Sequence, residues 1–180
     1  ESELARAAGL QMNARGCIVV DQHLRSSDLD IYAVGDAVEV KNFVSGEPAF
    51  IPLAGPANKQ ARIAADNICG IDSIYQGTQG SSVLKFGDLT IASTGLNERE
   101  ALRLGLDYDK VYLYMPHHVT FYPGFEDMQI KVLFARGSGR ILGAQLVGGK
   151  GVDKRCDVFA TAIRFGATAQ DLTELELCYA

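Results

Sequence analysis

Short apolar runs separated by turn-forming residues dominate the first 80 residues of the chain. Residues 16–20 and 31–34 are two such runs, and each pattern is typical of a strand. The second run has apolar side chains on both faces, so we expect it to be buried between two layers. Residues 41–56 hold three of the five prolines and are predicted to form a loop.

A helix is predicted over residues 57–69, directly after this loop. Pro56 suits the first turn, where a missing backbone N–H costs nothing, and Gly70 suits a left-handed C-terminal cap. The apolar side chains expected on one face of this helix are Ile63, Ala64 and Ile68.

The pattern changes after residues 70–82, which are rich in Gly, Ser, Thr and Gln and which we interpret as a domain boundary. Three strands are predicted beyond it, over residues 110–115, 129–135 and 140–147. The connections between them are short, which predicts an antiparallel meander.

Helices are predicted on both sides of these strands. Asn97–Glu100 is a capping box that opens a short helix ending at Gly105, and residues 168–171 form a second box that opens a last helix ending near Glu176. A third helix stops at Gly166, and its apolar stripe consists of Val152, Cys156, Phe159, Ala160 and Ile163.

Composition narrows the class of protein. The net charge is −5, so nothing suggests a nucleic-acid partner or an anionic membrane surface, and the apolar runs are too short to span a membrane. The first residues show neither an initiator Met nor a signal-peptide pattern, so we expect a cytoplasmic chain that is part of a longer protein. The cysteines lack metal-ligand spacing and are expected to be buried or half-buried free thiols: Cys17, Cys69, Cys156 and Cys178.

The most informative segment is 26–37, Ser-Ser-Asp-Leu-Asp-Ile-Tyr-Ala-Val-Gly-Asp-Ala. Gly35 and Asp36 follow a predicted strand, and ligands of open α/β sheets bind at the carboxyl ends of strands. Glycine allows a ligand to approach the backbone closely, and the carboxylate offers two oxygens to hydroxyl groups. A Gly-Asp pair alone is more often a strand end with an Asp that caps the next turn.

A second informative string is 51–68, Ile-Pro-Leu-Ala-Gly-Pro-Ala-Asn-Lys-Gln-Ala-Arg-Ile-Ala-Ala-Asp-Asn-Ile. It places a loop of small residues before a helix N-terminus, where unpaired N–H groups suit a carbonyl or an anionic atom. An ordinary helix start with an exposed Asn58 is the plainer interpretation.

Together the two strings resemble those of FAD-dependent pyridine nucleotide–disulfide oxidoreductases, in the branch of coenzyme A-disulfide reductases, persulfide reductases and NADH oxidases. Residues 92–96 and 148–155 also resemble, in kind and order, the dimerisation domain of that branch. The resemblance implies an α+β fold, with part of an FAD-binding α/β segment over 1–80 and an antiparallel-sheet-plus-helices dimerisation domain over 81–180. It also implies an FAD cofactor, NAD(P)H in the full-length protein, and a homodimer.

The resemblance assigns roles to individual residues. FAD contacts are expected from Gly35, Asp36, Ala37, Leu53 and Ala54, with Asp36 on the ribityl chain, and Asn58 is expected to face a thiol substrate.

Other roles fall on the second half of the chain. His118 resembles a residue near the nicotinamide. Tyr122 and Tyr179 resemble a catalytic tyrosine pair near the substrate sulfur, placed at the active site of the partner subunit, and Tyr122 is also expected to contact the substrate. Simple packing roles remain open for all three.

Two other patterns are weaker. Residues 148–151, Gly-Gly-Lys-Gly, lack the spacing of a phosphate-binding loop and are better explained as a turn from strand to helix. His117 and His118 are adjacent in a segment expected to be extended, so their side chains should point to opposite faces and not bind one metal ion.

The resemblance implies that the parent protein moves electrons from NAD(P)H through FAD and a cysteine, absent from this chain, to coenzyme A disulfide or a persulfide. The fragment alone is expected to be inactive, since it holds neither that cysteine nor a glycine-rich dinucleotide turn. An NADH oxidase or peroxidase of the same family, and a non-catalytic dimerisation fragment, stay open.

Overall fold

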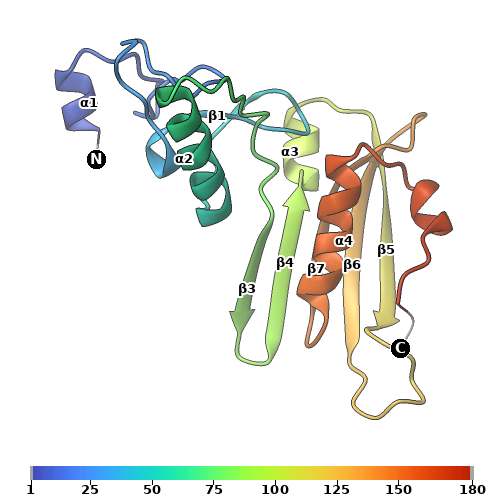
Figure 1. Ribbon diagram of the computed structural model, residues 1–180. Coiled ribbons are helices and arrows are strands. Elements are labelled where there is room, and N and C mark those ends of the chain that lie inside the picture. The colour runs from blue at the N-terminus through green and yellow to red at the C-terminus, as the bar shows by residue number, and fades with distance from the viewer. Residues whose placement is uncertain (1, 179–180) are drawn as a thin grey trace. The chain divides into compact units, whose positions relative to one another are not determined.

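The computed structural model describes residues 2–178, which form parts of two compact units, Glu1–Thr78 and Gln79–Ala180 (Figure 1). Each unit mixes helices with antiparallel strands, which confirms the α+β class. Among the described residues, no helix has the length and apolar character needed to cross a membrane.

The first unit has short elements around one longer helix. In chain order these are α1 (Glu3–Ala7), the 3₁₀ turn η1 (Gly35–Ala37), β1 (Val40–Lys41), β2 (Pro48–Ala49) and α2 (Ala54–Ile68). β1 and β2 form a small antiparallel hairpin inside the segment predicted as a loop. The core of the unit consists of Leu24, Val38, Val40, Ile63, Ala64 and Tyr75.

The prediction of strands over residues 16–20 and 31–34 is wrong. Ile18 makes single bridges to Met12 and Val38, and Tyr32 makes one to Arg25, so neither run belongs to a ladder. Residues 31–34 are half-buried, not covered on both faces. A strand needs a continuous row of hydrogen-bonding partners, and the described residues supply only isolated pairs.

Helix α2 begins three residues earlier than predicted, at Ala54, and Pro56 lies in its first turn. Gly70 has the left-handed backbone expected of a cap, with φ of +80°. Ile63 and Ala64 are buried as expected, but Ile68 is 65% exposed. Asn67 faces the unit instead, because its side chain donates to the carbonyl oxygens of Ile63 and Ser73.

The second unit is a five-stranded antiparallel sheet in the order β3-β4-β7-β6-β5. Its elements are β3 (Ser82–Phe86), β4 (Leu89–Gly95), α3 (Glu98–Arg103), β5 (Tyr108–Pro116), β6 (Asp127–Ala135), β7 (Ile141–Gly148), α4 (Val152–Arg164) and η2 (Asp171–Glu174). β5, β6 and β7 form the predicted meander, whereas the hairpin of β3 and β4 was not predicted and pairs with β7 through β4.

Helix α4 packs along one face of the sheet, over β4 and β7 (Figure 1). Its stripe is buried as predicted at Val152, Cys156, Phe159 and Ile163, while Ala160 is half-buried. Gly166 ends it with φ of +74°.

The two capping boxes differ in outcome. Asn97 accepts a hydrogen bond from the Glu100 amide at 2.9 Å, and α3 follows. Thr168 and Asp171 also cap each other's amides, at 2.7 and 3.1 Å, but only the single turn η2 follows. The predicted last helix is therefore wrong, because the backbone becomes extended at Leu175.

Candidate functional site

The turn η1 places Gly35 and Asp36 against helix α2. The Gly35 amide donates to the side-chain oxygen of Gln60 at 2.7 Å, and Gln60 is only 2% exposed. Gly35 has a left-handed backbone with φ of +75°, which favours glycine at this position. A residue of α2 thus fixes the path of the turn, and the Asp36 side chain is exposed.

The amino-terminal turn of α2 carries the other expected flavin contacts. Leu53 is the extended N-cap residue and offers no side-chain cap. The amides of Ala54 and Gly55 lie in the first turn, where helical N–H groups have no partner within the helix, and Pro56 has no N–H. The N–H groups at this end of α2 can therefore donate hydrogen bonds to a carbonyl or anionic oxygen.

Asn58 is exposed, but its side chain is already engaged. Its Nδ2 donates to the Ala54 carbonyl at 2.9 Å, one turn back along α2. The other polar atom of the side chain, the amide oxygen Oδ1, can accept a hydrogen bond.

These residues fit part of a flavin site. An exposed carboxylate at Asp36 can bind hydroxyl groups of a ribityl chain, and the helix start at Ala54 can face an oxygen of a flavin ring. When bound, FAD supplies hydride acceptance from a nicotinamide and electron delivery to a thiol or disulfide.

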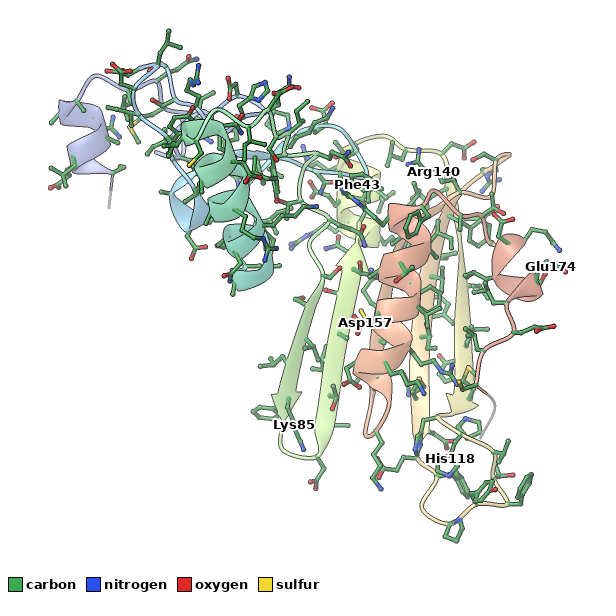
Figure 2. The ribbon with its side chains drawn as sticks, viewed as in Figure 1. Phe43, Lys85, His118, Arg140, Asp157 and Glu174 are labelled. Atoms are coloured by element: carbon green, nitrogen blue, oxygen red, sulfur yellow. The ribbon has the colours of Figure 1, made fainter. Side chains whose placement is uncertain are left out.

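The second group of expected site residues lies on the loop between β5 and β6, residues 117–126. Figure 2 shows His118 on this loop. The rings of His118 and Tyr122 meet edge to face with centroids 6.4 Å apart, and His118 Nε2 lies 3.4 Å from the Tyr122 carbonyl oxygen. The structure therefore brings His118 and Tyr122 together, and Tyr122 is half exposed at 51%.

The expectation that His117 and His118 point to opposite faces is wrong. Their rings are in contact, with His118 Nδ1 2.7 Å from His117 Nε2. β5 ends at Pro116, so the strand alternation stops before either histidine. In the described part of the chain, no group of three or more His, Cys, Asp or Glu side chains is arranged to hold a metal ion.

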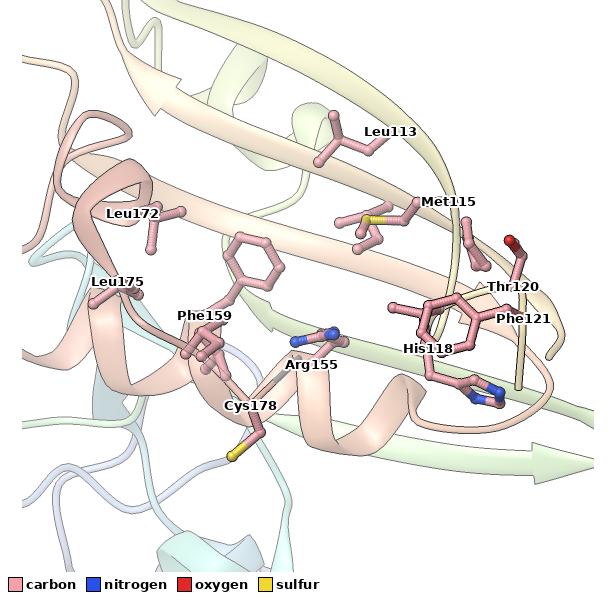
Figure 3. A pocket seen from close by; sticks show the side chains of 15 residues that line it. Leu113, Met115, His118, Thr120, Phe121, Arg155, Phe159, Leu172, Leu175 and Cys178 are labelled. Carbon is pink, nitrogen blue, oxygen red and sulfur yellow. The ribbon is translucent and has the colours of Figure 1, made fainter. Parts of the chain in front are cut away.

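A cavity of about 640 Å³ opens beside this loop (Figure 3). β5, the loop, α4 and the segment after η2 all contribute to its wall, which is mainly apolar. Arg155 of α4 brings a permanent positive charge to it, and His118 lies at its edge. The lining includes Leu113, Met115, Phe121, Phe159, Leu175 and Cys178.

Cys156 does not provide an activated thiol. Burial raises the pKa of the Cys156 thiol to about 11, and the nearby Asp157 and Asp153 add to that shift. Cys17 is buried too, but Cys69 and Cys178 are exposed, so the expectation of buried thiols is wrong for those two. Cys69 is the C-cap residue of α2, and Cys178 lies beyond η2, the last element.

Tyr179 lies outside the described residues. Two functional positions were missed by sequence reasoning. Gln60 is buried in the structure, and the available signal was its helical spacing of three and four residues from Ile63 and Ala64. Arg155 lies on α4 beside the apolar stripe, and nothing in its spacing indicated a cavity.

Comparison with known proteins gives the family. Residues 1–61 match the model of the pyridine nucleotide-disulphide oxidoreductases, and residues 81–179 match the dimerisation domain of that family. A coenzyme A disulfide reductase from Staphylococcus epidermidis is 34% identical over 180 residues, covering 99% of this chain and 41% of the relative. A protein named NADH oxidase from Methanocaldococcus jannaschii is 35% identical over 181 residues, covering 99% of this chain and 39% of the relative.

A solved structure, reduced Bacillus anthracis CoADR-RHD, is 50% identical with a TM-score of 0.97, covering all of this chain and 32% of that one. The chain thus spans between 39% and 41% of the curated relatives named above. Proteins of this kind depend on FAD and NAD(P)H. The chain belongs to the pyridine nucleotide-disulphide oxidoreductase family.

Proposed function

We propose that the full-length protein containing this chain reduces coenzyme A disulfide or a coenzyme A persulfide with NAD(P)H. In this proposal Gly35, Asp36 and Ala37, together with Leu53 and Ala54, hold part of the FAD, and residues 81–180 form the homodimer. The reducing equivalents reach the substrate through a cysteine outside this chain.

The observation that carries the proposal is the grouping of Tyr122 and His118 on one loop. A phenol and an imidazole are proton donors, and a sulfur leaving a disulfide needs a proton as negative charge develops on it. Reduction of one disulfide consumes two electrons and two protons and yields two thiols, so donors beside the sulfur have a defined task. Relatives named for coenzyme A disulfide reduction support the choice of substrate.

The four cysteines of this chain are not proposed as the nucleophile. A nucleophilic cysteine needs a lowered pKa, and Cys156 has a raised one. The fragment alone should therefore show no turnover.

The test is NAD(P)H oxidation by the full-length protein, followed with and without coenzyme A disulfide and with oxygen present or removed. We expect anaerobic oxidation that requires the disulfide and releases thiols. A rate that depends on oxygen and is unchanged by the disulfide would instead show an NADH oxidase, the second function open to this family.

A further inference from the structure

The glycine-rich turn between β7 and α4, residues 148–151, has a contact that its sequence did not explain. Lys150 Nζ lies 3.1 Å from Glu126 Oε1, and the Lys150 amide donates to Glu126 Oε2 at 3.1 Å. The Lys150 hydrogen bond lowers the pKa of the Glu126 carboxyl from its ordinary value. The ammonium group and the backbone amide of Lys150 therefore hold the turn to Glu126, the last residue of the loop that carries His118 and Tyr122.

Glycines flank Lys150 on both sides, and the left-handed backbone of Gly151 favours glycine there. A Cβ added at Gly149 would overlap the Glu126 carboxylate. Gly151 has φ of +73°, and a Cβ there would lie 3.4 Å from His117 Cβ. The turn thus lies against the Glu126 carboxylate at Gly149 and beside His117 at Gly151.

Glu126 then fixes the proton of His117. The His117 amide donates to the Glu126 carbonyl at 3.0 Å, and the Glu126 amide donates to His117 Nδ1 at 3.0 Å. His117 Nδ1 also lies 3.2 Å from the Glu126 carbonyl oxygen, but that oxygen already accepts the His117 amide. The Glu126 amide always carries its hydrogen and directs it at Nδ1, so Nδ1 accepts. The ring proton of neutral His117 therefore lies on Nε2.

The same reasoning gives the tautomer of His118. His117 Nε2 lies 2.7 Å from His118 Nδ1, so the Nε2 proton of His117 is donated and His118 Nδ1 accepts. Neutral His118 then carries its proton on Nε2. That atom lies 3.4 Å from the Tyr122 carbonyl oxygen.

We propose that His117 is a positioning residue: held by Glu126 and the Lys150 turn, it orients His118 as the Nε2-protonated tautomer and aims that proton at the Tyr122 turn. These contacts fix the tautomer of His118, one of the two proton donors that the proposed function uses. Their catalytic consequence rests on that proposed function, whereas the tautomers themselves do not.

The first test reads the tautomers directly in the full-length protein. Nitrogen-15 chemical shifts of labelled histidines, measured by solid-state NMR on sedimented protein and assigned with His117 and His118 variants, distinguish a protonated ring nitrogen from an accepting one. We expect both rings to have an accepting Nδ1 and a protonated Nε2. A protonated Nδ1 on neutral His117 or His118 overturns the inference.

A matched pair of substitutions tests the donor role. In His117→Gln the terminal amide can still donate toward His118 Nδ1, while His117→Phe keeps a ring and removes the donor. We expect His118 to keep its Nε2 proton in His117→Gln and to become a tautomer mixture in His117→Phe. Unchanged His118 shifts in a folded His117→Phe protein refute the donor role. Should His117→Phe fail to fold, His117→Met, which also removes the donor, replaces it with the same expected mixture.

Kinetics separate this inference from the proposed function. His117→Phe should slow reoxidation of the reduced enzyme by coenzyme A disulfide by roughly ten- to a hundredfold, the scale for losing a partner that orients a functional histidine. His117→Gln should recover most of that rate. If the wild type does not use the disulfide at all, the proposed function fails while the tautomer result stands. If the wild type uses it and His117→Phe is as fast, the positioning role fails.

Discussion

The Gly35 amide donates a 2.7 Å hydrogen bond to the side-chain oxygen of Gln60, a residue that is 2% exposed. This bond joins the turn that presents Asp36 to the helix whose first residues face the expected flavin. One buried side chain therefore holds the turn at Gly35 against helix α2.

We predict that Gln60→Leu weakens both the fold and FAD binding. Leucine has a similar size but no acceptor, so the Gly35 N–H is left without a partner, at a cost of about 1–3 kcal/mol in the free energy of unfolding. Denaturant unfolding and flavin content of the full-length protein measure the two effects. Arg62→Gln, on the exposed side of α2, is the control. Equal unfolding midpoints for Gln60→Leu and wild type would contradict the assigned bond.

Asp36→Ala should lower FAD occupancy. A hydrogen bond from a hydroxyl to a charged acceptor contributes roughly 1.5–3 kcal/mol, which corresponds to a drop in affinity of about ten- to a hundredfold. The flavin affinity of the full-length protein, titrated by visible absorbance or fluorescence, measures this. Asp30→Ala is a suitable control, because Asp30 is an exposed carboxylate on the same segment. Wild-type affinity in Asp36→Ala would remove Asp36 from the flavin site.

Local signals in the sequence predicted the fold where a few neighbouring residues decide the structure. The capping box at Asn97 and the glycine that ends α4 at Gly166 depend on contacts within one turn. The buried stripe through Phe159 follows from helical spacing alone. Each of these predictions is confirmed.

Predictions failed where a distant partner decides the structure. Residues 31–34 look like a doubly covered strand, but a strand forms only when another segment pairs along it, and Tyr32 finds a single bridge. The contact between His117 and His118 depends on the Glu126 backbone from the far side of the loop. Neither partner can be read from the apolar pattern of the segment itself.

The stability of the second unit should fall at low pH through Glu98. Its carboxylate accepts hydrogen bonds from Lys110, Lys131 and Tyr108, which lower the Glu98 pKa from 4.5 to about 2. A carboxyl with a lowered folded-state pKa stabilises the fold above its unfolded pKa. That contribution is lost as the pH falls from 4.5 toward 2.

Glu98→Gln should therefore flatten the fall of the unfolding midpoint over this pH range, while lowering the midpoint at neutral pH. Thermal unfolding of the full-length protein at several pH values measures both. Asp88→Asn, in the exposed turn between β3 and β4, should keep the wild-type slope. An unchanged slope in Glu98→Gln would rule out this carboxylate as the source.

We predict a two-fold symmetric homodimer through the second unit. Strand β5 is an edge strand whose side chains are exposed on both faces, including Tyr112 and Tyr114 on one and Leu113 and Met115 on the other. Such an apolar edge indicates an interface. Leu133 and Phe159, by contrast, are buried inside the unit.

Leu113→Glu should shift the full-length protein toward monomer, because a charge at the centre of an apolar interface is costly to bury. Sedimentation equilibrium at several concentrations measures the mass. Leu102→Glu, on the exposed side of α3 at 65% exposure, should leave the dimer intact. A wild-type protein that stays monomeric at high concentration would refute the dimer.

Measuring flavin reduction by NAD(P)H and flavin reoxidation by the disulfide separately distinguishes a proton-donor role of Tyr122 and Tyr179 from a packing role. A phenol has a pKa near 10, so at neutral pH it carries a proton that it can donate to a leaving sulfur. Tyr122 is exposed beside His118, as a donor to an external substrate has to be. A positioned acid contributes roughly 10²–10⁴-fold to a rate.

In stopped-flow experiments on the full-length protein, Tyr122→Phe and Tyr179→Phe should each slow reoxidation by the disulfide and leave flavin reduction by NAD(P)H nearly unchanged. Phe keeps the ring, so packing is preserved and only the hydroxyl is lost. If both hydroxyls serve one sulfur, the double variant should lose less than the product of the single losses, because the second hydroxyl has less left to do once the first is gone. Phe121→Leu on the same loop controls for loop packing. A wild-type reoxidation rate in Tyr122→Phe would leave Tyr122 with a packing role alone, since its hydroxyl would then do nothing in the step that needs a proton.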